Sequence, residues 1–257
     1  ESGVLTGKSP NWGGSLVRRE ATGYGLVYFV EEMLKARGQT LEGKTCVVSG
    51  SGNVAIYAIE KLQMLGAKVV ACSDSDSAIH DPQGIDLGTL SRLKEVERKR
   101  LREYAEVHPR AQCLAPSALW SIPCEVALPC ATQNELRDED VRTLIKNGCM
   151  VVGEGANMPT TPGGIRLLLE AGVAFGPGKA ANAGGVATSA LEMQQNASRD
   201  AWTFEYTEKR LQEIMCRIHQ ECHDAAEEFG SPGNYVLGAN VVGFRRVAEA
   251  MLAFGVI

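Results

Sequence analysis

The sequence lacks any apolar run that approaches the roughly 20 residues needed to span a bilayer. It also lacks a Cys-X-X-Cys pair, although it contains eight cysteines. Several of these, including Cys46, Cys72 and Cys149, lie in apolar runs typical of buried strands. These absences argue against a membrane protein and against a disulfide scaffold. We therefore expect reduced thiols and a cytoplasmic protein.

A strong charge imbalance is absent too. The 257 residues include 26 basic and 31 acidic side chains, which give a formal net charge of −5. A general nucleic-acid or anionic-membrane partner is therefore not expected. Hydrophobic residues make up 44% of the chain and charged residues 22%, as in a globular domain with a full core. The first residue is Glu1 and not Met, so we expect a processed or partial chain.

Short apolar runs alternate with amphipathic stretches as far as residue 175. This alternation predicts parallel βαβ units and hence an α/β fold, a doubly wound, Rossmann-like, mostly parallel sheet flanked by helices. Strands are expected over residues 44–49, 68–72, 112–114, 126–128, 150–152 and 173–175. Helices are expected over residues 20–37, 53–65, 87–103, 138–147 and 164–171.

From about residue 183 the strand signals stop. Helical patterns remain over residues 187–196, 207–229 and 240–253. We therefore expect one dinucleotide-binding domain, residues 1–257, that ends in a helical tail over residues 183–257. The sequence pattern leaves open whether this tail covers the sheet or reaches a second domain.

A glycine-rich segment follows the first expected strand and leads into an expected helix. It reads Gly50-Ser51-Gly52-Asn53-Val54-Ala55. This is the GxGxxA form of the dinucleotide fingerprint, in which the first glycine permits a tight turn and the second lets the backbone approach the pyrophosphate. The helix N-terminus offers N–H groups to the phosphates. The strand before the segment and the helix after it favour nucleotide binding over a turn without a ligand.

The end of the second expected strand bears on the choice between NAD and NADP. An acid here, Asp74, commonly binds the adenosine ribose of NAD and repels the 2′-phosphate of NADP. Ser51 and Ser75, however, are small donors that leave room for a phosphate. Six basic residues follow, and they either lie on a solvated amphipathic helix or reach this phosphate. They are Arg92, Lys94, Arg98, Lys99, Arg100 and Arg102.

Five segments together resemble the hexameric glutamate dehydrogenases. They are GGSLVRREATGYG (13–25), PCATQNE (129–135), EGANMPTT (154–161), GPGKAANAGGV (176–186) and GANVVGF (238–244). The resemblance covers Gly3 to Ile257 and implies the cofactor-binding, C-terminal half of an NADP-type enzyme. In that family an N-terminal domain carries the lysines that bind the 2-oxo acid and a catalytic aspartate. The chain alone is therefore expected to be inactive and to hold no catalytic residue.

The resemblance also implies the reaction, which is the reversible reductive amination of 2-oxoglutarate with ammonium and NADPH to give L-glutamate. The full-length enzyme is expected to be a homohexamer, with the helical tail returning to the N-terminal substrate domain. Serines at positions 51 and 75 resemble the NADP-using branch, and Arg100 is the basic residue best placed for the 2′-phosphate. NAD is the less favoured cofactor.

The site residues implied by the resemblance fall into two groups. Val186 and Ser189 match residues that line the substrate glutamate, although simple packing and a helix-surface hydroxyl remain alternatives. The cofactor would be bound by Thr22, Gly50, Ser51, Gly52, Asn53, Val54, Ser73, Asp74, Ser75, Arg100, Ala131, Thr132, Asn157 and Asn182.

Two other functions and a metal site are alternatives to this interpretation. A leucine, phenylalanine or valine dehydrogenase shares nearby motifs, and an isolated domain could sense a nucleotide without catalysis. Cys216, His219 and His223 are spaced to share one helix face, and their types suit zinc. They do not form a HExxH motif, no fourth ligand is indicated, and the resemblance implies no metal. We therefore expect no metal site.

Overall fold

The computed structural model describes residues 3–255, so Glu1, Ser2, Val256 and Ile257 lie outside the described part of the expected domain and tail. The strands are β1 (Thr45–Val48), β2 (Lys68–Ser73), β3 (Ala78–His80), β4 (Gln112–Leu114), β5 (Val126–Leu128), β6 (Val151–Gly153) and β7 (Ala174–Gly176). The α-helices are α1 (Ala21–Lys35), α2 (Asn53–Met64), α3 (Leu87–Ser91), α4 (Tyr104–Val107), α5 (Asp138–Lys146), α6 (Pro162–Glu170), α7 (Gly178–Ala181), α8 (Gly184–Ser198), α9 (Phe204–Glu228) and α10 (Tyr235–Phe254). Shorter turns are η1 (Pro10–Trp12), η2 (Arg92–Val96), η3 (Leu101–Glu103) and η4 (Pro116–Ser121).

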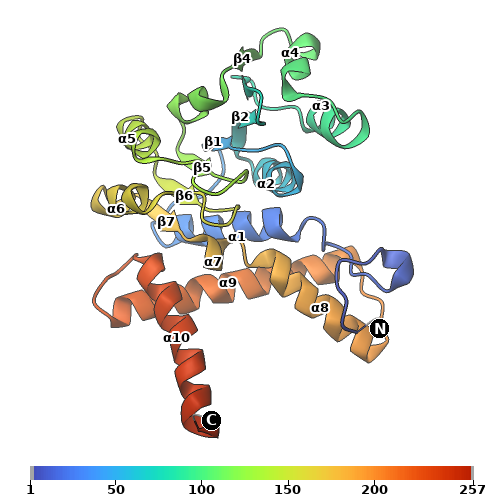
Figure 1. Ribbon diagram of the computed structural model, residues 1–257, viewed down its shortest axis with the longest axis vertical. Helices are drawn as coiled ribbons and strands as arrows, with labels where there is room; N and C mark the ends of the chain where they lie inside the picture. The colour runs from blue at the N-terminus through green and yellow to red at the C-terminus, as the bar shows by residue number, and fades with distance from the viewer. Residues whose placement is uncertain (1–2, 256–257) are drawn as a thin grey trace.

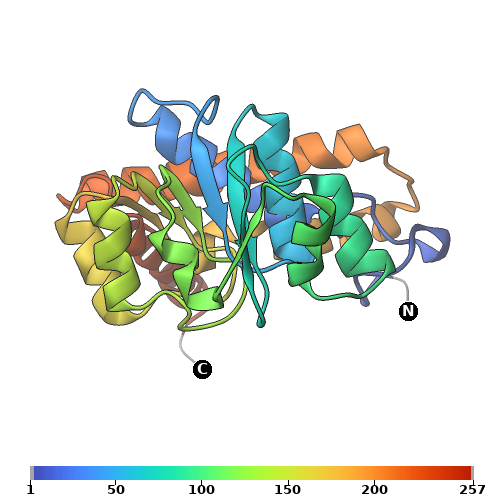
Figure 2. The ribbon, with the colours of Figure 1, turned by 90° about the horizontal axis from the view of Figure 1, so that it is seen from above.

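The strands form one sheet in the order β4-β3-β2-β1-β5-β6-β7. The run from β2 through β1, β5 and β6 to β7 is parallel, whereas β3 is antiparallel to both β2 and β4. Helices lie on both sides of the sheet (Figure 1 and Figure 2). The doubly wound, mostly parallel fold is thus confirmed. The strand order reverses between β1 and β5, where such folds open a crevice at the carboxyl ends of the strands.

Each face of the sheet has its own core because side chains alternate along a strand. In β1, Cys46 and Val48 join the core beneath α1 and α2, whereas Val47 joins the core beneath α5 and α6. All three side chains are fully buried. A parallel sheet covered on both faces needs apolar residues at every position, which explains the continuous apolar runs of the sequence.

Helix α1 joins the sheet to the helical tail, because it packs against α2, α8 and α9. Two glycines permit this close packing. A Cβ atom at Gly23 would lie 2.5 Å from the backbone nitrogen of Ala58, and one at Gly25 would lie 2.8 Å from Cα of Gly184. Any larger residue at either position would therefore separate α1 from α2 or from α8.

The tail consists of α8, α9 and α10, and its helical character is confirmed. Helices α8 and α9 lie along α1, and α10 extends away from the sheet (Figure 1). Phe244, Val247 and Leu252 are exposed on α10. Within residues 3–255, no helix is both long and apolar enough to cross a membrane.

The expected continuous helix over residues 87–103 is wrong. Helix α3 ends at Ser91, the π-helical turn η2 follows, and residues 97–100 are not helical. Arg98 adopts a left-handed conformation with φ +53°. The chain turns here so that the N–H group of Leu101 can donate to Asp74 at 2.9 Å. This tertiary contact overrides the helical propensity of the charged sequence. Strand β3, only three residues long, was not expected.

Candidate functional site

The glycine loop lies between the end of β1 and the start of α2, at the centre of the sheet. Gly50 has φ +85°, a conformation that favours glycine, and its N–H group donates to the Ser73 hydroxyl at 3.1 Å. Nothing lies within 4 Å of a Cβ atom placed on Gly52, so its outer side is open to a ligand. Gly52 is also the N-cap of α2, whose first N–H groups point toward this opening. The loop therefore presents backbone donors, with room for a phosphate.

Two cavities share Ala131, which packs against Gly50 of this loop. The first has a volume of about 540 Å³, and the second about 530 Å³. The first is lined by the expected residues Thr22, Val54, Ala131, Asn157, Asn182, Val186 and Ser189. The second is lined by the expected residues Ser73, Asp74, Ser75, Ala131 and Thr132. These expected residues therefore lie along one crevice beside the glycine loop. Gly50, Ser51, Gly52, Asn53 and Arg100 line neither cavity.

The carboxylate of Asp74 is fully engaged within the protein. Its Oδ1 accepts hydrogen bonds from the N–H groups of Asp76 (2.9 Å) and Ser77 (3.0 Å). Its Oδ2 accepts from the N–H group of Leu101 and from the ammonium of Lys94 at 3.1 Å. Burial raises the pKa of this carboxyl, but the N–H donors and the ammonium outweigh burial and lower it. Asp74 is therefore an ionised group whose charge is offset by Lys94 and whose oxygens are already hydrogen-bonded.

Most basic residues near this edge have acidic partners. Arg102 pairs with Asp76 at 2.8 Å, and Lys99 pairs with Glu97 and Glu103 at 3.1 and 3.0 Å. Arg100 differs, because its guanidinium donates to the Ser75 hydroxyl at 3.0 Å and has no acidic partner within residues 3–255. The two expectations for this segment are thus both modified. It is not a regular helix, and Arg100, like Lys94 and Arg102, reaches the turn that follows β2.

The other end of the crevice is built from two asparagines and the start of α8. The side-chain amide of Asn182 donates to Oδ1 of Asn157 at 2.8 Å and to the carbonyls of Gly155 and Ala156 at 3.3 Å. Val186 is 71% exposed, so packing within the described chain does not explain it. Thr22 belongs to the first turn of α1 and also faces this cavity.

Arg18 is a lining residue that the sequence reasoning missed. Its Nε donates to the Ser189 hydroxyl at 2.8 Å, so a cation and a hydroxyl lie side by side in the crevice. The signal for it was present, since Arg18 lies within the GGSLVRREATGYG segment just before α1. Helix α1 and helix α8 converge here because Gly184 and Gly185 pack against Ala21 and Thr22. This contact places the two side chains together.

Cys216, His219 and His223 do not form a group that could hold a metal ion. His219 is buried, and its Nε2 lies 3.0 Å from the Tyr235 hydroxyl. Burial lowers the pKa of His219 to about 4. His223 instead lies near Asp224 and Glu227. Within residues 3–255 no group of three or more His, Cys, Asp or Glu side chains is arranged to hold a metal ion.

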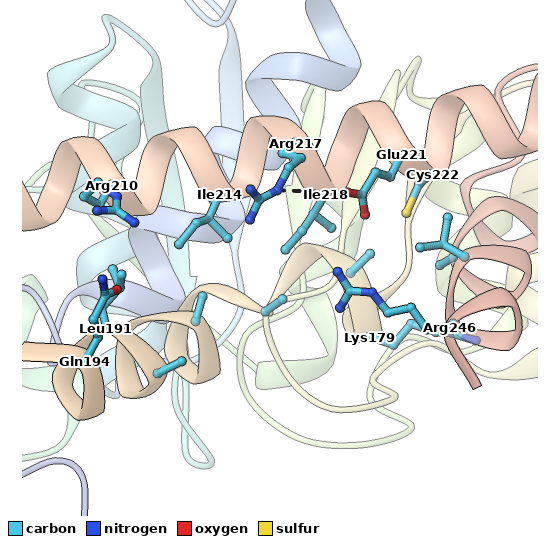
Figure 3. Close-up of a pocket in the computed structure, with 17 residues that line it drawn as sticks. Lys179, Leu191, Gln194, Arg210, Ile214, Arg217, Ile218, Glu221, Cys222 and Arg246 are labelled. Carbon is cyan, nitrogen blue, oxygen red and sulfur yellow. Dashed lines mark ion pairs between the residues drawn. The ribbon is translucent and has the colours of Figure 1, made fainter. Parts of the chain in front are cut away.

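A second hollow of about 660 Å³ lies between α8, α9 and α10 (Figure 3). Apolar side chains such as Ile214 and Ile218 line it, and Arg217 and Glu221 form an ion pair at its edge. We refer to it as the tail groove. It shares no lining residue with the crevice and contains no glycine loop. The crevice is therefore the candidate ligand site.

Comparison with known proteins gives a consistent result. Residues 13–255 match the family model described as Glutamate/Leucine/Phenylalanine/Valine dehydrogenase. The chain is 54% identical, over 261 aligned residues, to the NADP-specific glutamate dehydrogenase of Helicobacter pylori (strain ATCC 700392 / 26695). That alignment covers 99% of this chain and 58% of the relative. This chain therefore spans less than two thirds of the length of that relative.

Solved structures agree. The fold matches Plasmodium falciparum glutamate dehydrogenase with a TM-score of 0.96 and 45% identity, covering 98% of this chain and 55% of the other. It also matches a hetero-hexameric glutamate dehydrogenase from Thermus thermophilus in its Leu-bound form, with a TM-score of 0.85 and 27% identity. That match covers 99% of this chain and 58% of the other. The chain belongs to the glutamate/leucine/phenylalanine/valine dehydrogenase family.

Proposed function

We propose that this chain binds NADP(H) and forms the cofactor-binding part of a glutamate dehydrogenase. The main observation in support of NADP(H) is that the Asp74 carboxylate already has partners within the protein. Its charge is offset by Lys94 and its oxygens are occupied by N–H donors, so it is not free to bind a ribose hydroxyl. Arg100 and Ser75 lie beside it and offer donors to a 2′-phosphate. The NADP-specific names of close relatives support the same choice.

The crevice fits a dinucleotide from end to end. The pyrophosphate would lie over Gly50, Ser51, Gly52 and the N-terminus of α2, where backbone N–H groups and open space coincide. The adenosine would occupy the cavity lined by Ser73 and Thr132. The nicotinamide ribose would lie in the cavity that contains Asn157 and Asn182. In this arrangement Val54, Asn53, Ala131 and Thr22 form the floor and walls.

For the substrate we propose 2-oxoglutarate and glutamate. When bound, the nicotinamide supplies or accepts the hydride of reductive amination. The role of this chain is to bind and orient, since Arg18 and Ser189 present a cation and a hydroxyl at the nicotinamide end of the crevice. These groups suit a side-chain carboxylate, whereas the apolar side chain of leucine, phenylalanine or valine would leave the charge of Arg18 without an opposite charge. We propose Val186 as an apolar wall for the same substrate.

The proposal extends to the full-length protein. Relatives are longer than this chain, so we propose that the substrate lysines and the proton-transferring groups belong to a further domain, and that the assembly is a cytoplasmic homohexamer. We further propose that the tail, residues 183–257, returns to that domain. The direction of α10, its exposed Phe244, Val247 and Leu252, and the tail groove beside it support this.

Calorimetric titration of the chain with NADPH and NADH tests the cofactor assignment. We expect tighter binding of NADPH, and an Arg100→Ala variant that loses this preference while it keeps its affinity for NADH. Preference for NADH would restore Asp74 as a ribose ligand and refute the assignment. Binding of either nucleotide without activity in the full-length protein would favour a nucleotide-sensing role instead.

A further inference from the structure

The segment from Pro129 to Glu135 forms the wall that both parts of the crevice share. It leaves the end of β5 and passes directly over the glycine loop. A Cβ atom on Gly50 would lie 3.2 Å from the carbonyl oxygen of Cys130 and 3.3 Å from Cα of Ala131. The position of residues 130–132 therefore determines the width of the crevice where a pyrophosphate would pass. No helix or strand includes these residues, so side chains must fix them.

One carboxylate oxygen fixes this segment. Oε1 of Glu135 accepts hydrogen bonds from the N–H groups of Ala131 (3.0 Å) and Thr132 (3.3 Å) and from the hydroxyl of Ser49 (2.8 Å). The Ser49 oxygen in turn accepts from the N–H group of Cys130 at 2.8 Å. Three consecutive backbone N–H groups are thus tied, directly or through Ser49, to the side chain of Glu135. Ser49 is the last residue before the glycine loop, so the contact joins the two loops.

The negative charge of Glu135 does not explain why a carboxylate lies at this position. A negative charge beside a pyrophosphate repels the ligand. Burial also raises the pKa of this carboxyl, although the donors from Ser49, Ala131 and Thr132 oppose that shift. Both effects weigh against a carboxylate here. What the residue does supply is one acceptor that meets three donors at once.

We propose that Glu135 is a positioning residue of the dinucleotide site, which holds residues 130–132 over the glycine loop and strengthens nucleotide binding through its acceptor oxygen and not through its charge. The inference rests on the proposed binding of NADP(H). A segment that is already ordered loses less conformational entropy when the ligand binds, and this is the source of the added affinity.

Three variants separate the acceptor from the charge. Glu135→Ala removes both, and Glu135→Gln keeps a carbonyl acceptor at the same reach while it removes the charge. Glu170→Ala is the matched control, because it removes an exposed carboxylate from the last turn of α6 and lines neither part of the crevice. The dissociation constant of NADPH is measured for each, together with the unfolding temperature. Ser49→Ala, which removes the hydroxyl that links Glu135 to Cys130 but keeps the Glu135 bonds to Ala131 and Thr132, is a second probe if Glu135→Ala does not fold.

We expect Glu135→Ala to weaken NADPH binding by about tenfold or more, which corresponds to the loss of roughly 1.4 kcal/mol. Glu135→Gln should bind NADPH as tightly as the original chain or more tightly, because it removes a negative charge, and Glu170→Ala should bind it as the original chain does. The affinity of Ser49→Ala for NADPH should lie between those of Glu135→Ala and the original chain. If Glu135→Ala binds NADPH as well as the original chain, or if Glu135→Gln is as weak as Glu135→Ala, the positioning role is refuted.

Hydrogen exchange of the unliganded chain gives a readout that does not depend on the nucleotide. The amides of Ala131 and Thr132 should exchange at least about tenfold faster in Glu135→Ala, while those of β1 and α2 stay protected. Unchanged exchange would overturn the proposal. If the original chain binds no dinucleotide, the proposed function is refuted even when the amides of Ala131 and Thr132 exchange slowly. If it binds NADPH and the variants do not differ, only the role of Glu135 fails.

Discussion

Replacement of Lys94 by methionine should change the cofactor preference by freeing a charge that is now offset. Lys94 Nζ lies 3.1 Å from Oδ2 of Asp74, and both side chains are largely buried. In Lys94→Met, Asp74 keeps its three N–H donors and hence its charge, but it loses the neighbouring ammonium. An uncompensated carboxylate then faces the position proposed for the 2′-phosphate.

The size of the effect follows from Coulomb's law. Two unit charges about 6 Å apart interact by roughly 1–3 kcal/mol at the effective dielectric constant of a protein surface. NADPH binding should therefore weaken by roughly 5- to 150-fold, whereas NADH, which has no 2′-phosphate, should change little. Calorimetric titration with both nucleotides at one fixed salt concentration measures the two dissociation constants. The ratio between them is the decisive quantity.

Lys99→Met is the matched control, because Lys99 pairs only with the partly exposed Glu97 and Glu103. It should leave both dissociation constants unchanged. If Lys94→Met weakens NADPH and NADH equally, the ion pair serves the general shape of the site. If neither constant changes, the proposed position of the 2′-phosphate is wrong.

Three further predictions concern other parts of the molecule. The folded pKa of His219 is about 4 against an ordinary 6.5, so its contribution to stability is complete above pH 6.5 and declines as the pH falls toward 4, by about 3 kcal/mol in full. Urea unfolding should show that the free energy of unfolding falls less between pH 7.5 and pH 4.5 in His219→Gln than in the original chain. An equal fall in the two proteins would refute the lowered pKa of His219. Gly50→Ala should lower the free energy of unfolding by about 1–3 kcal/mol and abolish dinucleotide binding, because of its φ of +85° and the nearby Cys130 carbonyl; thermal unfolding and titration test both. In the full-length enzyme Arg18→Met should raise the KM for 2-oxoglutarate by about tenfold or more and leave that for NADPH unchanged, whereas a change in the NADPH constant alone would contradict the proposed role.

Much of the fold could be predicted from the sequence because burial on both sheet faces leaves a clear pattern. The apolar runs at Cys46–Val48 and at residues 126–128 are strands, and each is followed by the glycine or loop signal that ends it. The glycine loop was found because its chemistry requires particular residues at fixed spacing. The tail helices could be predicted because the apolar residues on their buried faces repeat with helical spacing.

The remaining features depend on contacts between distant segments. The segment after Ser91 has the composition of a helix, yet Asp74, far away in sequence, draws the N–H group of Leu101 into a turn. No local pattern contains that information. The same holds for Arg18, whose role appears only when α1 and α8 converge and bring Ser189 to 2.8 Å. Helical spacing did predict that His219 and His223 share a face, since their ring centroids lie 6.0 Å apart, but it could not show that Tyr235 covers this face.

We propose that the 2′-phosphate of NADP binds beside Arg100 and Ser75. Phosphorus NMR tests it directly, since the 2′-phosphate has its own resonance and a second pKa of about 6 in free nucleotides. In the complex with this chain, we predict that this pKa falls by about one unit or more, because an adjacent guanidinium favours the dianion. The shift should disappear in Arg100→Ala. A 2′-phosphate that titrates in the complex as it does in free NADP, while the pyrophosphate resonances respond to binding, would contradict the account.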